Sequence, residues 1–483
     1  MATPIPKNRC RFSTAEVIRA TSAKYLGGKE MAFEGVSIDS RSIAPGALFV
    51  ALRGVRDGHE FLEAAAARGA AAALVEHGRT HPALACFEVE DTLTALGALA
   101  RFHLNRTRAH HQLPTIAIGG AAGKTTTKEL TAAIARALFG EILATPGNLN
   151  NLIGVPMTIL TLTDAHHAAV LECGTNRQGE IERLARIVAP DVALVLNVDV
   201  EHTEGLGSLE GVADEEAELY LTAGIAIVST SELMLLSRIP IGMETVKFGA
   251  TADADVRLAS RAVVTPGRQR IAIALAKSMT AEGVDAALEA NLGLLGAASA
   301  MNAAAAIAAV IAAYARPLGR SAVAAVARAL AAVEPVAGRL STREVASVVV
   351  IDDSYNANPR SVRVALEAAR ETADGLHARL IVAIGDMLEL GDLAPSMHTE
   401  ALRDTYRARP DCCILVGPEM SAALDTVGRD GHILPRPPLL ERASDSLAAA
   451  TIVREFVRPG DVLLVKGSRG IAMERIIEAL AAE

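Results

Sequence analysis

The sequence predicts an α/β fold built around two doubly wound parallel sheets. The first observation is that apolar segments of strand length alternate with helical patterns from about residue 36 onward. The second is that this alternation restarts after a break at residues 335–339. The third is that polar residues follow the apolar segments. Ligands bind at the carboxyl ends of parallel strands, so each sheet is expected to have its own ligand edge.

Size and composition restrict the class of protein. A chain of 483 residues should hold two to four domains, and its formal net charge of −9 argues against nucleic acid or an anionic membrane as the main partner. The five cysteines follow no metal or disulfide spacing, which suits a reducing cytosol. No apolar segment follows the basic residues near the N-terminus, so we expect no signal peptide and a cytoplasmic location.

One apolar segment, residues 292–315, is long enough to cross a membrane. It is mostly alanine and glycine, and it lacks aromatic or basic anchors at its ends. We therefore predict a buried helix and no membrane partner.

Within residues 36–76, strand patterns alternate with loops that carry Asp39, Ser40, Arg41 and His59. Ligand contacts collect in loops of this kind. The alternative is that Asp39 and Arg41 simply pair on the surface, and the residues alone favour this pairing. A helical pattern over 92–105 then leads into the central region.

A glycine-rich loop joins a strand at 114–118 to a helix that begins near Thr126. Such a loop binds phosphate because its backbone N–H groups turn inward, the helix N-terminus adds partial positive charge and Lys124 adds a full one. Thr125 would offer its hydroxyl to a magnesium ion. The standard spacing has glycine where this chain has Ile118, and an ordinary strand-to-helix turn is the alternative. We favour nucleotide binding.

Polar residues follow the next strands of the same predicted sheet. The loop 145–151 contains three asparagines, which suit a neutral polar ligand or a phosphate edge but are also common in turns. Glu172 ends the strand 168–171, and His202 follows the strand 192–198. Parallel strands place both near Lys124, where a carboxylate and an imidazole can serve a metal ion.

The rest of the chain completes the two sheets. A helix over 209–220 carries four acidic residues, most simply a solvated face. Three strands between residues 225 and 276 and an alanine-rich helix around Asn302 complete the central region. Beyond the break, we predict strands at 348–351, 380–384, 414–416 and 462–465.

Taken together, these loops resemble the Mur ligase family, and within it the MurF type. The resemblance covers nearly the whole chain. It is carried by Asp39-Ser40-Arg41 with Asp57-Gly58-His59, and by the stretches 148–156, 353–359, 385–391 and 466–468.

The resemblance implies three domains: an N-terminal domain for the UDP-sugar at 1–92, a central P-loop-type ATPase domain at 93–334 and a Rossmann-like C-terminal domain at 335–483. It also implies an ATP-dependent amide ligase of peptidoglycan precursor synthesis, acting as a monomer. ATP would phosphorylate the terminal carboxylate of UDP-N-acetylmuramoyl-tripeptide, and the amine of D-Ala-D-Ala would attack the acyl phosphate.

The resemblance also assigns roles to residues. Catalysis would depend on Lys124, Glu172 and His202; Thr125 and Glu172 would hold one Mg²⁺, and His202 would help to hold a second. ATP would contact Gly119, Gly120, Ala121, Ala122, Gly123, Lys124, Thr125, Thr126, Asn302, Arg339 and Asp353. The other substrates would contact Ser40, Arg41, Asn148, Asn151, Thr175, Tyr355, Asn356, Asn358 and Lys466.

The chain departs from the family at three places. Gly119, Ala121 and Ala122 stand where the family usually has threonine or serine, and residues 296–299 replace a Gly-Arg-His-Asn stretch. The family lysine that is carbamylated to bind a metal falls at Glu216, and no lysine lies between residues 128 and 247. Our hypothesis is that Glu216 supplies a permanent carboxylate to a second metal ion.

Two other functions compete with this interpretation. The departures are compatible with a catalytically weak paralogue that binds nucleotide or UDP-sugar and acts by interaction, and another Mur-type amide ligase would use a different substrate. The presence of Lys124, Glu172 and His202 together favours an active enzyme. The stretches 354–359 and 385–391 favour the MurF substrates.

Overall fold

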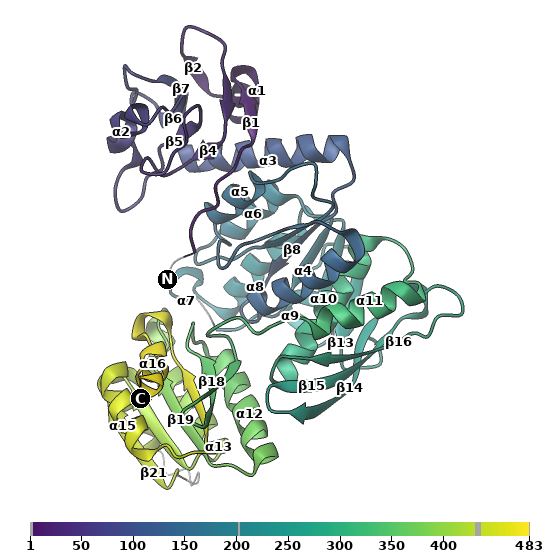
Figure 1. Ribbon diagram of the computed structural model, residues 1–483, viewed down its shortest axis with the longest axis vertical. Helices are drawn as coiled ribbons and strands as arrows, with labels where there is room; N and C mark the ends of the chain where they lie inside the picture. Colours follow the sequence, from purple (N-terminus) through teal and green to yellow (C-terminus); the bar gives the residue numbers. More distant parts are fainter. Residues whose placement is uncertain (1–2, 201–202, 430–435, 483) are drawn as a thin grey trace.

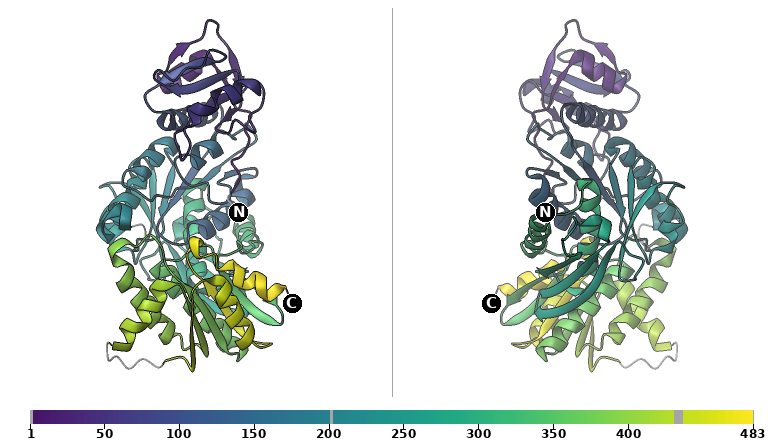
Figure 2. Two further views of the ribbon diagram at one scale, coloured as in Figure 1. Left: turned by 90° about the vertical axis from the view of Figure 1, so that its left-hand side faces the viewer. Right: turned by 90° about the vertical axis from the view of Figure 1, so that its right-hand side faces the viewer.

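The computed structural model describes residues 3–200, 203–429 and 436–482. These residues form an elongated molecule of three α/β domains, with the N-terminal domain at one end and the central domain in the middle (Figures 1 and 2). The predicted three-domain α/β fold is therefore confirmed. The predicted boundaries at 92/93 and 334/335 stay predictions.

The N-terminal domain contains a five-stranded sheet in the order β2-β7-β6-β5-β4 and a separate antiparallel pair, β1 and β3. Its strands are β1 (Arg11–Ser13), β2 (Lys24–Leu26), β3 (Ala32–Glu34), β4 (Val36–Ser37), β5 (Leu48–Val50), β6 (Ala72–Glu76) and β7 (Ala85–Val89). Its helices are α1 (Thr14–Thr21), η1 (Gly58–Phe61) and α2 (Leu62–Ala67). The long helix α3 (Thr92–His110) joins it to the central domain (Figure 1).

The central sheet has nine strands in the order β16-β15-β14-β13-β12-β11-β8-β10-β9. In this order, neighbouring strands from β14 to β9, including β8, are parallel, whereas β15 is antiparallel to both β14 and β16. The strands are β8 (Thr115–Gly119), β9 (Leu143–Ala144), β10 (Ala169–Glu172), β11 (Val192–Val195), β12 (Ile225–Ser229), β13 (Glu244–Gly249), β14 (Val256–Thr265), β15 (Arg268–Leu275) and β16 (Ala287–Leu292).

The prediction of three strands between residues 225 and 276 is wrong, because the structure has four there, β12 to β15. Two of the four, β14 and β15, form a long hairpin that turns at Gly267, whose φ of 78° is in the left-handed region. Most of β14 is exposed. It therefore lacks the alternation of apolar and polar residues that identifies a half-buried strand.

Helices cover both faces of the central sheet. One face packs on α4 (Lys124–Phe139), α10 (Gly296–Tyr314) and α11 (Arg320–Ala331). The other packs on α3, α5 (Gly154–Ile159), α6 (Glu180–Val188) and α8 (Leu209–Ala217). Shorter elements complete the domain: α7 (Thr203–Leu206), η2 (Glu218–Tyr220), α9 (Leu233–Leu236) and η3 (Lys277–Met279).

Helix α10 is the apolar segment that is long enough to cross a membrane. In the structure its residues from Ala303 to Val310 are fully buried against the central sheet and its neighbouring helices. The prediction of a buried core helix is confirmed.

The C-terminal sheet has six strands in the order β17-β18-β22-β19-β20-β21, all parallel except β17. They are β17 (Ser341–Val345), β18 (Val348–Asp353), β19 (Leu380–Gly385), β20 (Cys412–Val416), β21 (Leu439–Ala443) and β22 (Val462–Lys466). One face packs on α12 (Pro359–Leu376), α13 (Ala394–Arg407) and α14 (Pro418–Arg429), and the other on α15 (Ser446–Phe456) and α16 (Glu474–Ala481). Two short 3-10 turns are η4 (Gly391–Leu393) and η5 (Arg469–Ile471).

A partly buried polar chain joins the first two domains. Arg106 on α3 bonds to Glu16 on α1 at 3.0 Å and to Nδ1 of His103 at 3.0 Å. The other ring nitrogen of His103 lies 3.0 Å from the carbonyl oxygen of Leu162 in the central domain. Burial of the His103 ring lowers its pKa. A protonated ring would place an N–H at Nδ1 against the positively charged Arg106 guanidinium. The neutral form of the His103 ring is therefore favoured at this junction.

The junction predicts a pH-dependent stability. Folded His103 binds its proton more weakly than the unfolded chain does, so the free energy of unfolding should fall as pH drops through the usual histidine pKa of about 6.5. We expect His103→Gln to flatten this dependence in urea unfolding between pH 5 and pH 8. His110→Gln, an exposed position on the same helix, is the control. Equal pH slopes for wild type and His103→Gln would contradict the prediction.

Candidate active site

The carboxyl ends of the central and C-terminal sheets face one cleft of about 630 Å³. From the central domain it is lined by the phosphate loop, the asparagine-rich loop, Glu172 and the first turns of α10. From the C-terminal domain it is lined by the segments that follow β18 and β22. Both sheets thus contribute to a single site.

The phosphate loop needs glycine at two positions. Gly120 has a φ of 115° and Gly123 a φ of 88°, both in the left-handed region. A Cβ at Gly120 would lie 2.9 Å from the Leu196 nitrogen, and one at Gly123 would lie 3.0 Å from the Asn302 side chain. Helix α4 begins directly at Lys124, so its first N–H groups point out of the loop at the cleft.

The Lys124 ammonium group lies across the same loop. It donates to the carbonyl oxygens of Gly120 and Ala121, the latter at 3.3 Å. Lys124, Thr125 and Thr126 all line the cleft. The structure thus brings the predicted loop residues and Asn302 together.

Glu172 lines the cleft and is buried, with only 1% of its surface exposed. Its Oε1 accepts hydrogen bonds from Thr125 Oγ1 at 3.2 Å and from Asn150 Nδ2 at 2.8 Å. Its Oε2 is buried and has no hydrogen-bond partner among the residues that the structure describes. A buried carboxylate oxygen without a partner is costly unless a cation pairs with it.

These residues fit a magnesium nucleotide. A hydroxyl, a carboxylate with an unused oxygen and an open row of helix N–H groups lie side by side in the cleft. Within the described ranges, no three His, Cys, Asp or Glu side chains form a group that could hold a metal ion. Magnesium commonly combines one or two protein ligands with nucleotide phosphates, so such a cage is not required.

The sequence analysis missed three residues in or beside the site. Asn150 holds Glu172, and its position between Asn148 and Asn151 was the available signal. Lys128 is buried and donates to the Thr145 carbonyl oxygen at 3.0 Å and to the Glu129 carboxylate. Asn197 bonds to the phosphate loop, and its place directly after a strand of the same sheet was the signal.

The interpretation of four solvated acidic residues is wrong for two of them: Glu215 and Glu216 on α8 are buried, whereas Asp214 is exposed. Glu215 and Glu216 are 3% and 2% exposed. Glu215 accepts from the Gly179 and Ile181 N–H groups at 2.7 Å each and from Thr175 Oγ1 at 3.2 Å. Glu216 accepts from the Gly120 N–H at 2.6 Å. Its role as a metal ligand stays a prediction.

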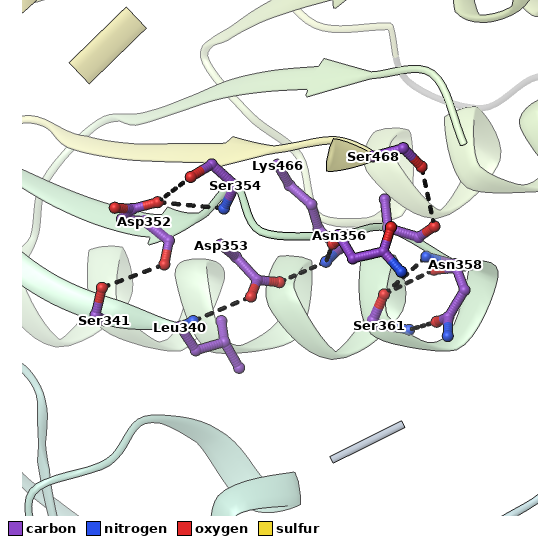
Figure 3. A network of polar contacts seen from close by, with 11 residues as sticks. Leu340, Ser341, Asp352, Asp353, Ser354, Asn356, Asn358, Ser361, Lys466 and Ser468 are labelled. Atoms are coloured by element: carbon purple, nitrogen blue, oxygen red, sulfur yellow. Dashed lines mark hydrogen bonds and ion pairs between the residues drawn. The ribbon is translucent and has the colours of Figure 1, made fainter. Parts of the chain in front are cut away.

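The second half of the site lies on the C-terminal sheet. Lys466 is 1% exposed, and its Nζ lies 2.5 Å from Asp353 Oδ2 and 3.0 Å from the Asn356 carbonyl oxygen (Figure 3). These contacts follow from the parallel pairing of β18 with β22, which places Asp353 opposite Lys466. Asp353 Oδ1 also accepts from the Leu340 N–H at 3.0 Å.

Neighbouring residues complete this side of the cleft. The Arg339 guanidinium lies 4.1 Å from the centre of the Tyr355 ring, and both residues line the cleft. Asn358 is the N-cap of α12, accepting from the Ser361 N–H at 2.8 Å (Figure 3). The exposed Asn356 side chain follows Tyr355 at the cleft.

Of the other predicted site residues, some line the cleft and others do not. Asn148, Asn151 and Thr175 line the cleft. Ser40 and Arg41 lie in the N-terminal domain and do not line it. Arg41 pairs with Asp39 at 2.9 Å and keeps the pKa of that carboxyl low, so the predicted pairing is present, while the contacts of Ser40 and Arg41 with substrate stay predictions. His202 lies outside the described residues.

Comparison with known proteins agrees with this architecture. Three family descriptions match: the Mur ligase family catalytic domain at 32–103, the Mur ligase middle domain at 118–310 and the Mur ligase glutamate ligase domain at 338–469. The UDP-N-acetylmuramoyl-tripeptide--D-alanyl-D-alanine ligase of Escherichia coli is 33% identical, covering 94% of this chain and 95% of that protein. The enzyme of the same name from Bacillus subtilis is 31% identical, covering 96% and 97%.

Solved structures give the same result. A crystal structure of MurF from Acinetobacter baumannii superposes with a TM-score of 0.84 at 28% identity, covering 99% of this chain and 100% of that one. MurF from Thermotoga maritima, in complex with ADP, superposes with a TM-score of 0.78 at 25% identity, covering 93% and 97%. The chain therefore belongs to the Mur ligase family, and within it to the MurF type.

Proposed function

We propose that this chain is an ATP- and magnesium-dependent ligase that joins D-Ala-D-Ala to the terminal carboxylate of UDP-N-acetylmuramoyl-tripeptide. The observation that carries the proposal is the shared cleft. It joins a phosphate loop and a buried carboxylate with an unused oxygen to polar groups of a second domain. We further propose that the enzyme works as a monomer in the cytoplasm, where its nucleotide substrates are made.

The central domain would hold ATP. The N–H groups at the start of α4 would receive the phosphates, with Asn302 beside the loop and Arg339 and Asp353 reaching from the C-terminal side. Thr125 and Glu172 would hold Mg²⁺, which neutralises phosphate charge when bound. His202 and Glu216 as ligands of a second magnesium ion stay predictions.

The chemical difficulty is that a carboxylate must approach the γ-phosphate, although both are anions. Two unit charges 4 Å apart repel by about 4 kcal/mol at an effective dielectric constant of 20. Lys124 supplies positive charge where the two groups meet. The carboxylate oxygen would attack the γ-phosphorus and release ADP, and the amine of the dipeptide would then displace phosphate to form the amide.

The two remaining substrates would enter from opposite domains. Ser40 and Arg41 would bind the UDP end, and Asn148, Asn151 and Thr175 would position the tripeptide at the cleft. Tyr355, Asn356 and Asn358 would receive D-Ala-D-Ala. Lys466, already paired with Asp353, would act by fixing the Asn356 backbone through its carbonyl oxygen.

A second candidate function is a catalytically weak paralogue that binds nucleotide or UDP-sugar and acts by interaction. The observation that favours it is the loss of hydroxyl and basic side chains at the cleft. Ala121, Ala122 and Ala298 line the cleft where the family resemblance leads us to expect polar groups.

Phosphate release from ATP separates the two candidates. We expect release only when UDP-N-acetylmuramoyl-tripeptide and D-Ala-D-Ala are both present, because the acyl phosphate is consumed only by the amine. No release with any combination of substrates, although ATP still binds, would favour the paralogue.

Removing the loop cation should abolish this activity. Lys124→Ala is expected to lower kcat about 10²–10³-fold, because it removes charge that stabilises the transferring phosphoryl group. Lys277→Ala, at an exposed position, is the matched control and should leave phosphate release unchanged. An active Lys124→Ala enzyme would contradict the assigned role.

Glu172 should couple nucleotide binding to magnesium. For wild type we expect Mg²⁺ to strengthen ADP binding in calorimetric titrations. In Glu172→Gln this gain should shrink by at least about tenfold, because the charged ligand is lost. Glu282→Gln, at an exposed position, is the control. An unchanged magnesium effect in Glu172→Gln would refute this assignment.

A further inference from the structure

Three successive N–H groups of the phosphate loop are already bonded within the protein. The Gly120 N–H donates to Glu216 Oε2 at 2.6 Å. The Ala121 N–H donates to the backbone oxygen of Asn197 at 3.0 Å, and the Ala122 N–H donates to its Oδ1 at 2.8 Å. Asn197 Nδ2 returns a bond to the Ala122 carbonyl oxygen at 2.8 Å. The Asn197 side chain and the Ala122 backbone thus form a two-bond pair.

The sheet explains how Asn197 reaches the loop. Strands β8 and β11 are parallel neighbours, and Val195 lies opposite Gly119. Two residues further along each chain, Asn197 therefore runs beside Ala121 and Ala122. Glu216 lies on α8 and reaches Gly119 and Gly120 from the face of the central sheet that packs on α8. The exposed fractions of Asn197 and Glu216 are 8% and 2%, so water competes little for these bonds.

The loop cannot make these bonds by itself. Its residues from Gly119 to Gly123 carry no hydroxyl, amide or charged side chain. Two glycines with left-handed backbone also leave it many alternative conformations when free. External side chains therefore have to select the conformation that leaves the N–H groups at the start of α4 directed at the cleft.

We propose that Asn197 and Glu216 are positioning residues that fix the phosphate loop in its binding-competent shape. The proposal rests on the proposed function of this loop as the nucleotide site. It assigns the phosphates to the N–H groups from Gly123 onward, because those of residues 120–122 are occupied. If the loop adopts this shape in only a fraction of the molecules, the apparent affinity for nucleotide is reduced by the same fraction.

Amide hydrogen exchange of the nucleotide-free protein tests the loop shape directly. The peptide that contains residues 119–123 should exchange slowly in wild type. It should exchange at least about tenfold faster in Asn197→Leu, which keeps similar volume but removes both side-chain bonds. Asn197→Asp retains an acceptor for the Ala122 N–H and loses the donor, so its rate should lie between the two. Asn105→Leu, at an exposed position, is the control.

Affinity for ADP provides the second readout. We expect Asn197→Leu to raise the Kd for ADP about tenfold with or without Mg²⁺, while its thermal unfolding confirms a folded protein. Exchange rates and Kd values within twofold of wild type would overturn the proposal. A wild-type protein that fails to bind ADP would instead refute the proposed function, and the exchange rates would still decide whether these residues shape the loop.

Glu216 variants separate positioning from metal binding. The side-chain oxygen of Glu216→Gln can still accept the Gly120 N–H, whereas Glu216→Ala cannot. Positioning predicts that the Kd for ADP of Glu216→Gln stays within about threefold of wild type with or without Mg²⁺, and that Glu216→Ala weakens binding in both conditions. A loss confined to Mg²⁺-containing solutions in both variants would overturn positioning by Glu216 and favour the metal-ligand hypothesis.

Discussion

The parallel register of β8, β10 and β11 is the constraint on which the site depends. It places Glu172 opposite Ile118 and Val195 opposite Gly119, so the three strands end together. Side chains that are far apart in the sequence therefore lie close together at the carboxyl ends of these strands. This one edge of the sheet brings together the phosphate loop, the buried Glu172 carboxylate and Asn197.

A similar edge in the C-terminal domain faces the same cleft, and ion pairs hold the two domains together. Arg360 at the start of α12 bonds to Glu232 of the central domain at 2.9 Å. Farther along α12, Glu371 accepts from Arg261 on β14 at 2.9 Å. The Arg261–Glu371 ion pair thus connects the long hairpin that contains β14 to α12 of the C-terminal domain (Figure 1).

Much of this architecture follows from local sequence signals. The glycine-rich loop, Glu172 at a strand end and the restart of the α/β pattern after residue 335 all depend on short-range periodicity, and the structure places them as such patterns predict. The burial of polar side chains by distant parts of the fold, in contrast, does not follow from local sequence signals. Glu215 and Glu216 look solvated in the sequence, because nothing nearby reveals that backbone N–H groups of distant loops will bond to them. Strands β17 and β21 of the C-terminal sheet were missed because they are only partly buried and lack a continuous apolar run.

The transfer of oxygen from the tripeptide to phosphate tests the central claim most directly. UDP-N-acetylmuramoyl-tripeptide labelled with ¹⁸O in its terminal carboxylate would be incubated with ATP, Mg²⁺ and D-Ala-D-Ala, and the released phosphate analysed by mass spectrometry. With both oxygens of that carboxylate labelled, we expect one ¹⁸O atom in each phosphate released, since the carboxylate oxygen attacks phosphorus and leaves with it. Phosphate released without label would show that the carboxylate is not phosphorylated and would contradict the account.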